Sequence, residues 1–296
     1  MKKLLGIMGV IGVAVVAMVI GCGKEKPVVT DEEAIQTIVD SDDYFNLTRG
    51  DDTDHADTTG SKDSLLGNPL WWRKVTDKTK QRVITVVGDS AYVERTIHRT
   101  GLFRTIGRVV DDSTGDTTWF DGKKPLGDTL RMRATFKRTG DNAANDRGWR
   151  LKKLSGAYGW SDNYGNDSIV HTVRIDSIRI QSTSYPDTML KNPLETLFNK
   201  ENVMTFAPAE NITVTLYTNV TDGEAYLHVF QTPWPGHYRI LMASNGNGSY
   251  TNATPWHAQL IQGVRFAFFD LMKYGTIHDT VYPYDFDGWL YPYRVK

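Results

Sequence analysis

The stretch QRVITVVGDSAYVERTIHRTGLFRTI, residues 81–106, decides the fold. Apolar and polar residues alternate on both sides of Gly88-Asp89-Ser90, and a period of two predicts β-strands joined at a turn. A second stretch of this kind, residues 128–156, carries its turn near 141–146. The sequence therefore predicts two long antiparallel hairpins in its first half.

The alternation in the second stretch also predicts which side chains are buried. One set of alternating residues is apolar and the other is mostly basic, as expected of a strand with one face on the core and one in water. The apolar set is Leu130, Met132, Ala134 and Phe136, and the outward set is Arg131, Arg133, Thr135 and Lys137.

A short helix is predicted upstream of the hairpins, over about 31–45. Thr30 and Glu33 have the spacing of a capping box, and apolar residues recur at helical spacing from Ala34 to Val39. An acidic loop, residues 46–64, follows. One helix followed by long hairpins resembles the cystatin-like and nuclear-transport-factor-like cones. That resemblance implies an α+β domain over 31–160, with the helix on a curved antiparallel sheet, and it transfers no site residues.

The second half of the chain has short alternating segments separated by turn residues. In NITVTLYTNVTDGEAYLHVF, residues 211–230, two such segments flank Thr221-Asp222-Gly223. Short strands with Gly, Pro, Asn and Asp turns are typical of β-sandwiches. Residues 168–296 resemble an immunoglobulin-like module, so we predict a mainly β protein with a β-sandwich after the α+β domain.

The charge distribution is uneven along the chain, although the formal net charge is only −1. Residues 31–63 hold 11 acidic and 2 basic side chains, whereas residues 71–154 hold 19 basic and 10 acidic ones. One interpretation is that the two segments neutralise each other. The other is a basic surface for anionic lipid headgroups or polysaccharide. The absence of an overall basic excess argues against a nucleic-acid partner.

The amino-terminal segment has the layout of a secretory signal. Lys2 and Lys3 precede an uncharged apolar run, residues 4–20, and the only cysteine follows at position 22. Val19-Ile20-Gly21-Cys22 resembles the bacterial lipobox. The resemblance implies a signal peptide over 1–21, lipidation of Cys22, a tether over 22–30 and, with Gly23 next, an outer-membrane location. The alternative is an uncleaved membrane anchor.

The sequence contains no recognisable catalytic motif. G-x-S-x-G and H-E-x-x-H are both missing from it. Two groups of aspartates suggest calcium, since closely spaced carboxylates supply the oxygens that this ion prefers. The alternatives are a plain polar loop for the first group and a turn for the second. The groups are Asp51, Asp52, Asp54 and Asp57, and Asp285 with Asp287.

Aromatic residues in predicted loops are the remaining candidates for a binding site. Trp234, His237, Tyr250 and Trp256 lie close together in sequence, and such rings either stack on a glycan or protein partner or fill a core. We therefore expect a lipid-anchored extracytoplasmic protein with a non-catalytic binding or envelope-assembly role. The alternatives are a polysaccharide-acting envelope enzyme, and a small-ligand binder that uses the concave face of the first domain.

Overall fold

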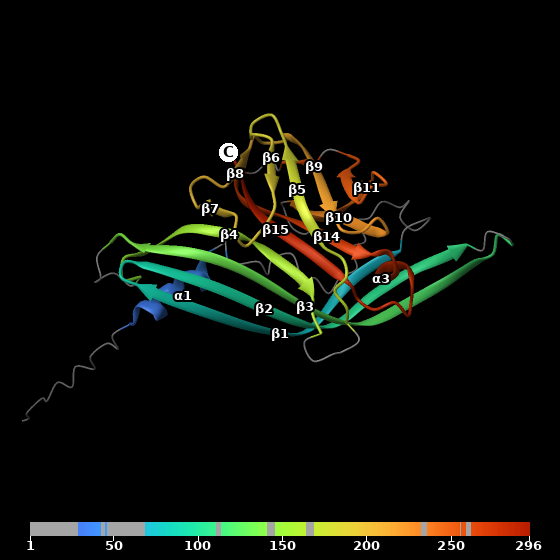
Figure 1. Cartoon of the computed structure of the whole chain (residues 1–296), viewed down its shortest axis with the longest axis horizontal. Coiled ribbons are helices and arrows are strands. Elements are labelled where there is room, and N and C mark those ends of the chain that lie inside the picture. Colours follow the sequence, from blue (N-terminus) through green and yellow to red (C-terminus); the bar gives the residue numbers. More distant parts are fainter. Residues whose placement is uncertain are drawn as a thin grey trace, which may run out of the picture.

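The protein is mainly β in the computed structural model, with one large antiparallel sheet and two short helices (Figure 1). The structure describes residues 29–42, 45, 69–110, 114–140, 146–163, 169–231, 236–254, 256–258 and 262–296; the side chains of 109, 110, 230, 231 and 236–238 are not described. Within these residues, no helix has the length and apolar composition needed to cross a bilayer. The predicted signal peptide, most of the tether and the acidic loop lie outside them.

Four long strands follow the first helix and form two hairpins, as the alternation predicted. They pair in chain order, and Val87 faces Ser90 across the turn at Gly88. Gly88 has φ +56°, in the left-handed region that favours glycine in tight turns. The elements are α1 (Asp31–Ser41), β1 (Leu70–Val87), β2 (Ser90–Val110), β3 (Thr117–Arg138) and β4 (Trp149–Ser161).

Helix α1 confirms the predicted capping box, because Thr30 and Glu33 exchange side-chain to backbone hydrogen bonds. It ends at Ser41, four residues before the predicted end. Its apolar side packs on the inner face of the hairpins, where Phe45 stacks on Phe136 at 6.2 Å between ring centroids. Asp31 pairs with Arg138 of β3 and with Arg147 of the β3–β4 turn, and Asp40 pairs with Arg82 of β1. Two of the five described carboxylates of the acidic segment thus pair with the basic segment, as self-neutralisation predicts, whereas Asp42 pairs with Lys200.

The second half of the chain adds eleven short or medium strands and one helical turn. They are β5 (Ile175–Gln181), β6 (Thr188–Leu190), β7 (Leu197–Asn199), β8 (Met204–Phe206), β9 (Asn211–Thr218), β10 (Gly223–Gln231), β11 (Gly236–Ser244), β12 (Ser249–Asn252), β13 (Trp256–His257), β14 (Gly263–Lys273), α3 (Tyr274–His278) and β15 (Phe286–Val295).

Strand β15 joins the two halves, since it pairs with β4 on one side and β14 on the other. The sheet runs β1-β2-β3-β4-β15-β14-β10, and β11 then leads into a second layer. The first half of β11 pairs with β10 and its second half with β12. The second layer, β12-β9-β5-β6, gives a sandwich-like arrangement (Figure 1). The domain boundary predicted between residues 160 and 168 thus lies between β4 and β5, which both belong to the same continuous sheet.

Both faces of β15 are buried. Phe286 and Leu290 point to the inner face of the hairpins, while Tyr291 and Tyr293 on the opposite face contact Phe198 of β7 and Phe206 of β8. The turn predicted as the alternative for Asp285 and Asp287 does not include residues 286–288, since Phe286, Asp287 and Gly288 belong to β15. Hydrogen-bond partners offset the free-energy cost of burying the Asp287 carboxylate in this strand.

A buried charge network closes the curled sheet by linking β1 to β14. The guanidinium of Arg73 lies 2.9 Å from Asp270 Oδ2 and donates to Tyr284 Oη at 2.8 Å. His228 Nε2 lies 3.1 Å from the same Asp270 oxygen. A second pair, Arg99 with Asp128, is bidentate at 2.5 and 3.0 Å.

This network and α1 together cover the inner face along β2. Apart from Gly101, every inward residue of β2 from Ala91 to Thr105 is at most 5% exposed. Lys80 of β1, which is paired with the inward Ile97, is nevertheless exposed on this face, so the alternatives that place a ligand or an active site there stay predictions.

Candidate functional site

Three of the residues predicted to carry lipid or to bind a partner lie where the structure does not describe side chains. Cys22 and Trp234 fall outside the described residues, and only the backbone of His237, in β11, is described. The aspartates of the acidic loop also lie outside. Lipidation of Cys22 and the roles of Trp234 and His237 stay predictions.

Tyr250 and Trp256 are core side chains, each 1% exposed. Tyr250 Oη accepts a hydrogen bond from the backbone N–H of Gly223 at 3.2 Å. The ring of Trp256 packs edge-on against Tyr293, at 4.9 Å between centroids. Neither ring has a face left for a partner, which corresponds to the alternative of aromatic residues filling a core.

Asp285 and Asp287, the predicted calcium ligands, are fully buried and bonded to the protein itself. Asp285 accepts hydrogen bonds from the Thr172 N–H at 2.9 Å, the Thr172 hydroxyl and the Tyr282 hydroxyl at 3.2 Å. Among the described residues, no three His, Cys, Asp or Glu side chains are grouped to hold a metal ion. Asp285 instead fixes the segment that leads into β5.

A different set of side chains forms a partly exposed aromatic surface on the outer face of the sheet. The rings of Tyr158 and Trp160 stack at 5.0 Å between centroids, with 28° between their planes. The guanidinium carbon of Arg131 lies 5.5 Å from the Trp160 ring centroid, and Arg131 Nε lies 3.6 Å from Glu94 Oε1. We call Arg131, Tyr158 and Trp160 the platform.

Strand register explains why these side chains meet. Arg131 is paired with Tyr158, and Thr129 with Trp160, so all four point to the same face. Asp287 of β15 is paired with Trp160 from the other side. Glycines let the backbones approach closely here, since a Cβ at Gly156 would lie 2.7 Å from the Leu290 carbonyl oxygen.

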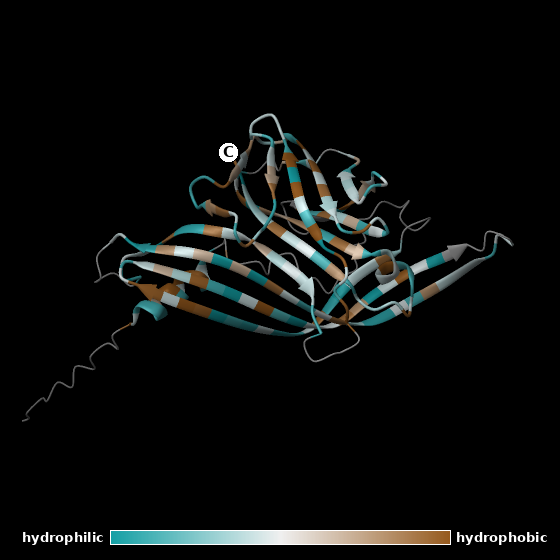
Figure 2. Ribbon diagram, in the orientation of Figure 1, coloured by the Kyte–Doolittle hydropathy of each residue, from teal (hydrophilic) through white to brown (hydrophobic). Residues whose placement is uncertain are grey.

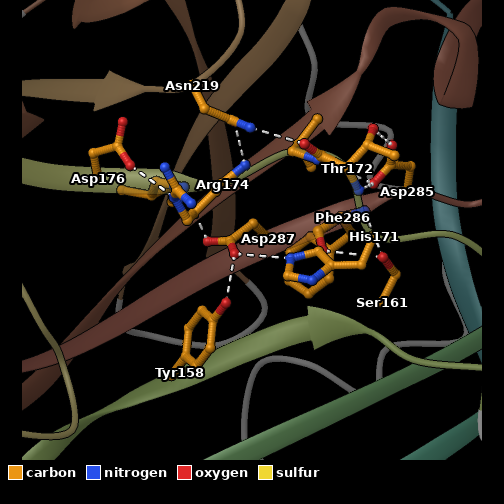
Figure 3. A network of polar contacts seen from close by, with 12 residues as sticks. Tyr158, Ser161, His171, Thr172, Arg174, Asp176, Asn219, Asp285, Phe286 and Asp287 are labelled. Atoms are coloured by element: carbon orange, nitrogen blue, oxygen red, sulfur yellow. Dashed lines mark hydrogen bonds and ion pairs between the residues drawn. The ribbon is translucent and has the colours of Figure 1, made fainter.

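Polar groups border the platform on the β15 side (Figure 3). Asp287 Oδ2 accepts a hydrogen bond from Tyr158 Oη at 2.9 Å and lies 3.1 Å from His171 Nε2, while its Oδ1 accepts from the Ile175 N–H. Burial raises the pKa of Asp287, and the bonds from His171 and Tyr158 partly oppose that rise. The His171 side chain is 31% exposed, so this group reaches the solvent.

A second polar group borders the platform on the β2 side. His98 Nδ1 lies 2.7 Å from Thr129 Oγ1, which donates to Asp162 Oδ2 at 2.6 Å. The side chains of His98 and Asp162 are 14% and 25% exposed. Together the two groups place hydroxyl, imidazole and carboxylate functions around a pair of aromatic rings.

Sequence reasoning missed this surface, although part of its signal was present. Tyr158 and Trp160 are two residues apart in a strand, which places both rings on one face. The partners Asp287 and His171 are 129 and 13 residues from Tyr158, and only the pairing of β4 with β15 brings them together. No protein-family model matches the chain, and no curated protein matches it.

Proposed function

We propose that the protein is a lipid-anchored, extracytoplasmic protein of the bacterial envelope that binds glycan at the platform. The anchoring part is supported by the lipobox-like residues 19–22 after an apolar run and by Gly23, which favours the outer membrane. The binding part is supported by one observation, the stacked Tyr158–Trp160 pair with Arg131 beside it and polar groups on two sides. The C–H face of a sugar ring packs on aromatic rings while its hydroxyls need such polar neighbours.

Replacing Cys22 by alanine is expected to release the protein from the membrane. A single thiol carries the proposed acyl chains, and stable attachment requires more than one chain. The measurement is labelling with radioactive palmitate, together with membrane fractionation. A Lys24→Ala variant, which changes the tether but keeps the cysteine, should remain labelled. Equal labelling of wild type and Cys22→Ala would refute the anchor.

Replacing Trp160 by alanine is expected to weaken glycan binding by about tenfold or more, as truncation of a central aromatic contact commonly does. Affinity electrophoresis through gels that contain soluble peptidoglycan fragments or the polysaccharide part of lipopolysaccharide measures this. The matched control is Trp119→Ala, because Trp119 is 61% exposed and lies away from the platform, near one end of β3. Equal retardation of both variants in every gel would contradict the proposal.

An envelope enzyme that acts on polysaccharide is the second candidate, and one observation favours it. His171 and Asp287 form a pair with a carboxyl group whose pKa is raised by burial, as acid–base sites require. Three donors already hold the Asp287 carboxylate, which favours a positioning role and therefore binding. Release of new reducing ends from the bound polysaccharide would favour the enzyme.

A further inference from the structure

Large apolar side chains are exposed where β1 and β2 meet. Val83, Val87 and Tyr92 are 63%, 62% and 56% exposed, on the outer face beside the turn at Gly88–Asp89. Figure 2 shows hydrophobic colour at this end of β1, next to α1. Apolar groups gathered in water at one end of an elongated sheet mark an interaction surface.

Basic side chains stand next to these residues on the same face. Register pairs Ser90 with Lys137 and Lys137 with Arg150, and it pairs Thr135 with both Tyr92 and Lys153. We call Val83, Val87, Tyr92, Lys137, Arg150 and Lys153 the tip patch. Acidic neighbours are present as well: Asp146 pairs with Arg150, Asp89 lies near Arg138, and Glu94 pairs with Arg133. Lys137 and Lys153 are exposed, so the patch combines apolar groups with positive charge.

The tether leaves the fold at this same end. Arg147 donates to the carbonyl oxygen of Val29 at 2.9 Å and to Asp31 at 2.6 Å. Arg138 binds Asp31 through its side chain, and its backbone N–H donates to the Asp89 carbonyl oxygen at 3.0 Å. Val29 is thereby held close to the turn that carries the tip patch. The seven steps from Cys22 to Val29 reach at most about 25 Å when fully extended.

We propose that the tip patch docks on the bilayer that holds the anchor, with Val83, Val87 and Tyr92 in the headgroup region and the basic residues against anionic lipid phosphates. This inference rests on the lipidation of Cys22 for its geometry. Apolar and aromatic groups combined with Lys or Arg are what a membrane interface accommodates. The short tether keeps the patch within reach of the bilayer surface.

The first test places a nitroxide label at Val87→Cys in the lipidated chain, where the lipid on Cys22 leaves the new cysteine as the only free thiol. Collisions with a water-soluble nickel complex are measured in vesicles of phosphatidylethanolamine and phosphatidylglycerol. We expect the collision rate at position 87 to fall severalfold on vesicle binding. The matched control is Val281→Cys, since Val281 is 87% exposed in the turn between α3 and β15. Equal accessibility at both positions in co-floating protein overturns the proposal.

The second test separates docking from anchoring. A chain that starts at residue 22 with Cys22→Ser is sedimented with phosphatidylglycerol vesicles at low salt. Replacing Lys137 and Lys153 by glutamine should weaken binding about 25-fold, because each contributes about fivefold near an anionic surface. Replacing Lys74 and Lys123 should change it little, since Lys74 lies about 40 Å along β1 from the tip, beyond the screening length of about 30 Å at 0.01 M salt.

The two tests fail in different ways. A Cys22 peptide without lipid in mass spectrometry refutes the anchor, and the lysine variants still decide the docking. Equal loss of vesicle binding in both lysine pairs, or no binding of the parent chain, overturns the tip patch while leaving the anchor intact.

Discussion

Replacing Asp270 by alanine is expected to lower the free energy of unfolding by about 3–5 kcal/mol, because removing one partner of a buried ion pair leaves the other charge unpaired. Asp270 is 0% exposed and lies within 3.1 Å of both Arg73 and His228. Urea unfolding followed by circular dichroism measures the change. The loss should appear as a lower midpoint with a similar slope.

Acid titration gives this prediction a second readout. Burial alone would raise the pKa of Asp270, but the charges of Arg73 and His228 outweigh it and lower the pKa to about 2, from an ordinary value of 3.8. The contribution of the Asp270 carboxylate to the free energy of unfolding is therefore complete above its ordinary pKa of 3.8. It is lost as the pH falls from there towards 2. The alanine variant should lack this part of the acid dependence.

The matched control is Asp121→Ala, which removes a surface partner of Arg104 and Lys123. The Asp121 side chain is 45% exposed, and surface pairs of this kind contribute under about 1 kcal/mol. If both variants unfolded at the same urea concentration, the buried network would not hold β1 against β14.

A chain that stops at Asp285, and so lacks β15, is expected to show no cooperative unfolding transition. Strand β15 supplies Phe286 and Leu290 to one core and Tyr291 and Tyr293 to the other, and all four are at most 6% exposed. Losing it also leaves β4 and β14 without their shared neighbour. Calorimetry and near-ultraviolet circular dichroism test for the lost transition.

The control for this truncation is a chain that lacks only Lys296, which follows β15 and is exposed. A fragment of residues 29–163 gives the decisive comparison, because it corresponds to the predicted α+β domain. Cooperative unfolding of that fragment would show that the first half folds without β15, and would support the domain division drawn from sequence.

Local features of the fold were predictable because local residues determine them. The capping box at Thr30 and the turn at Gly88 are set by neighbours within three residues, and alternation defined the inner and outer faces of β3. The closure of the sheet was not predictable. Arg73 and Tyr284 are 211 residues apart, and nothing near either residue indicates the other.

The candidate site shows the same division. The spacing of Tyr158 and Trp160 places two rings on one face and could have been recognised from sequence, but their acidic border depends on β15 lying beside β4. Tyr250 and Trp256 failed as surface candidates because aromatic residues near turns serve cores as readily as surfaces, and burial depends on the distant strands that cover them.

The central position of β15 has a consequence for the order in which this chain folds during synthesis. Strand β15 follows the other described strands in chain order, yet both cores need it, so a growing polypeptide has no complete core until β15 has been made. Stable folding of the earlier strands before that point is disfavoured by the same arrangement. The cost is a long interval with unpaired strand edges, which are prone to pair with other chains.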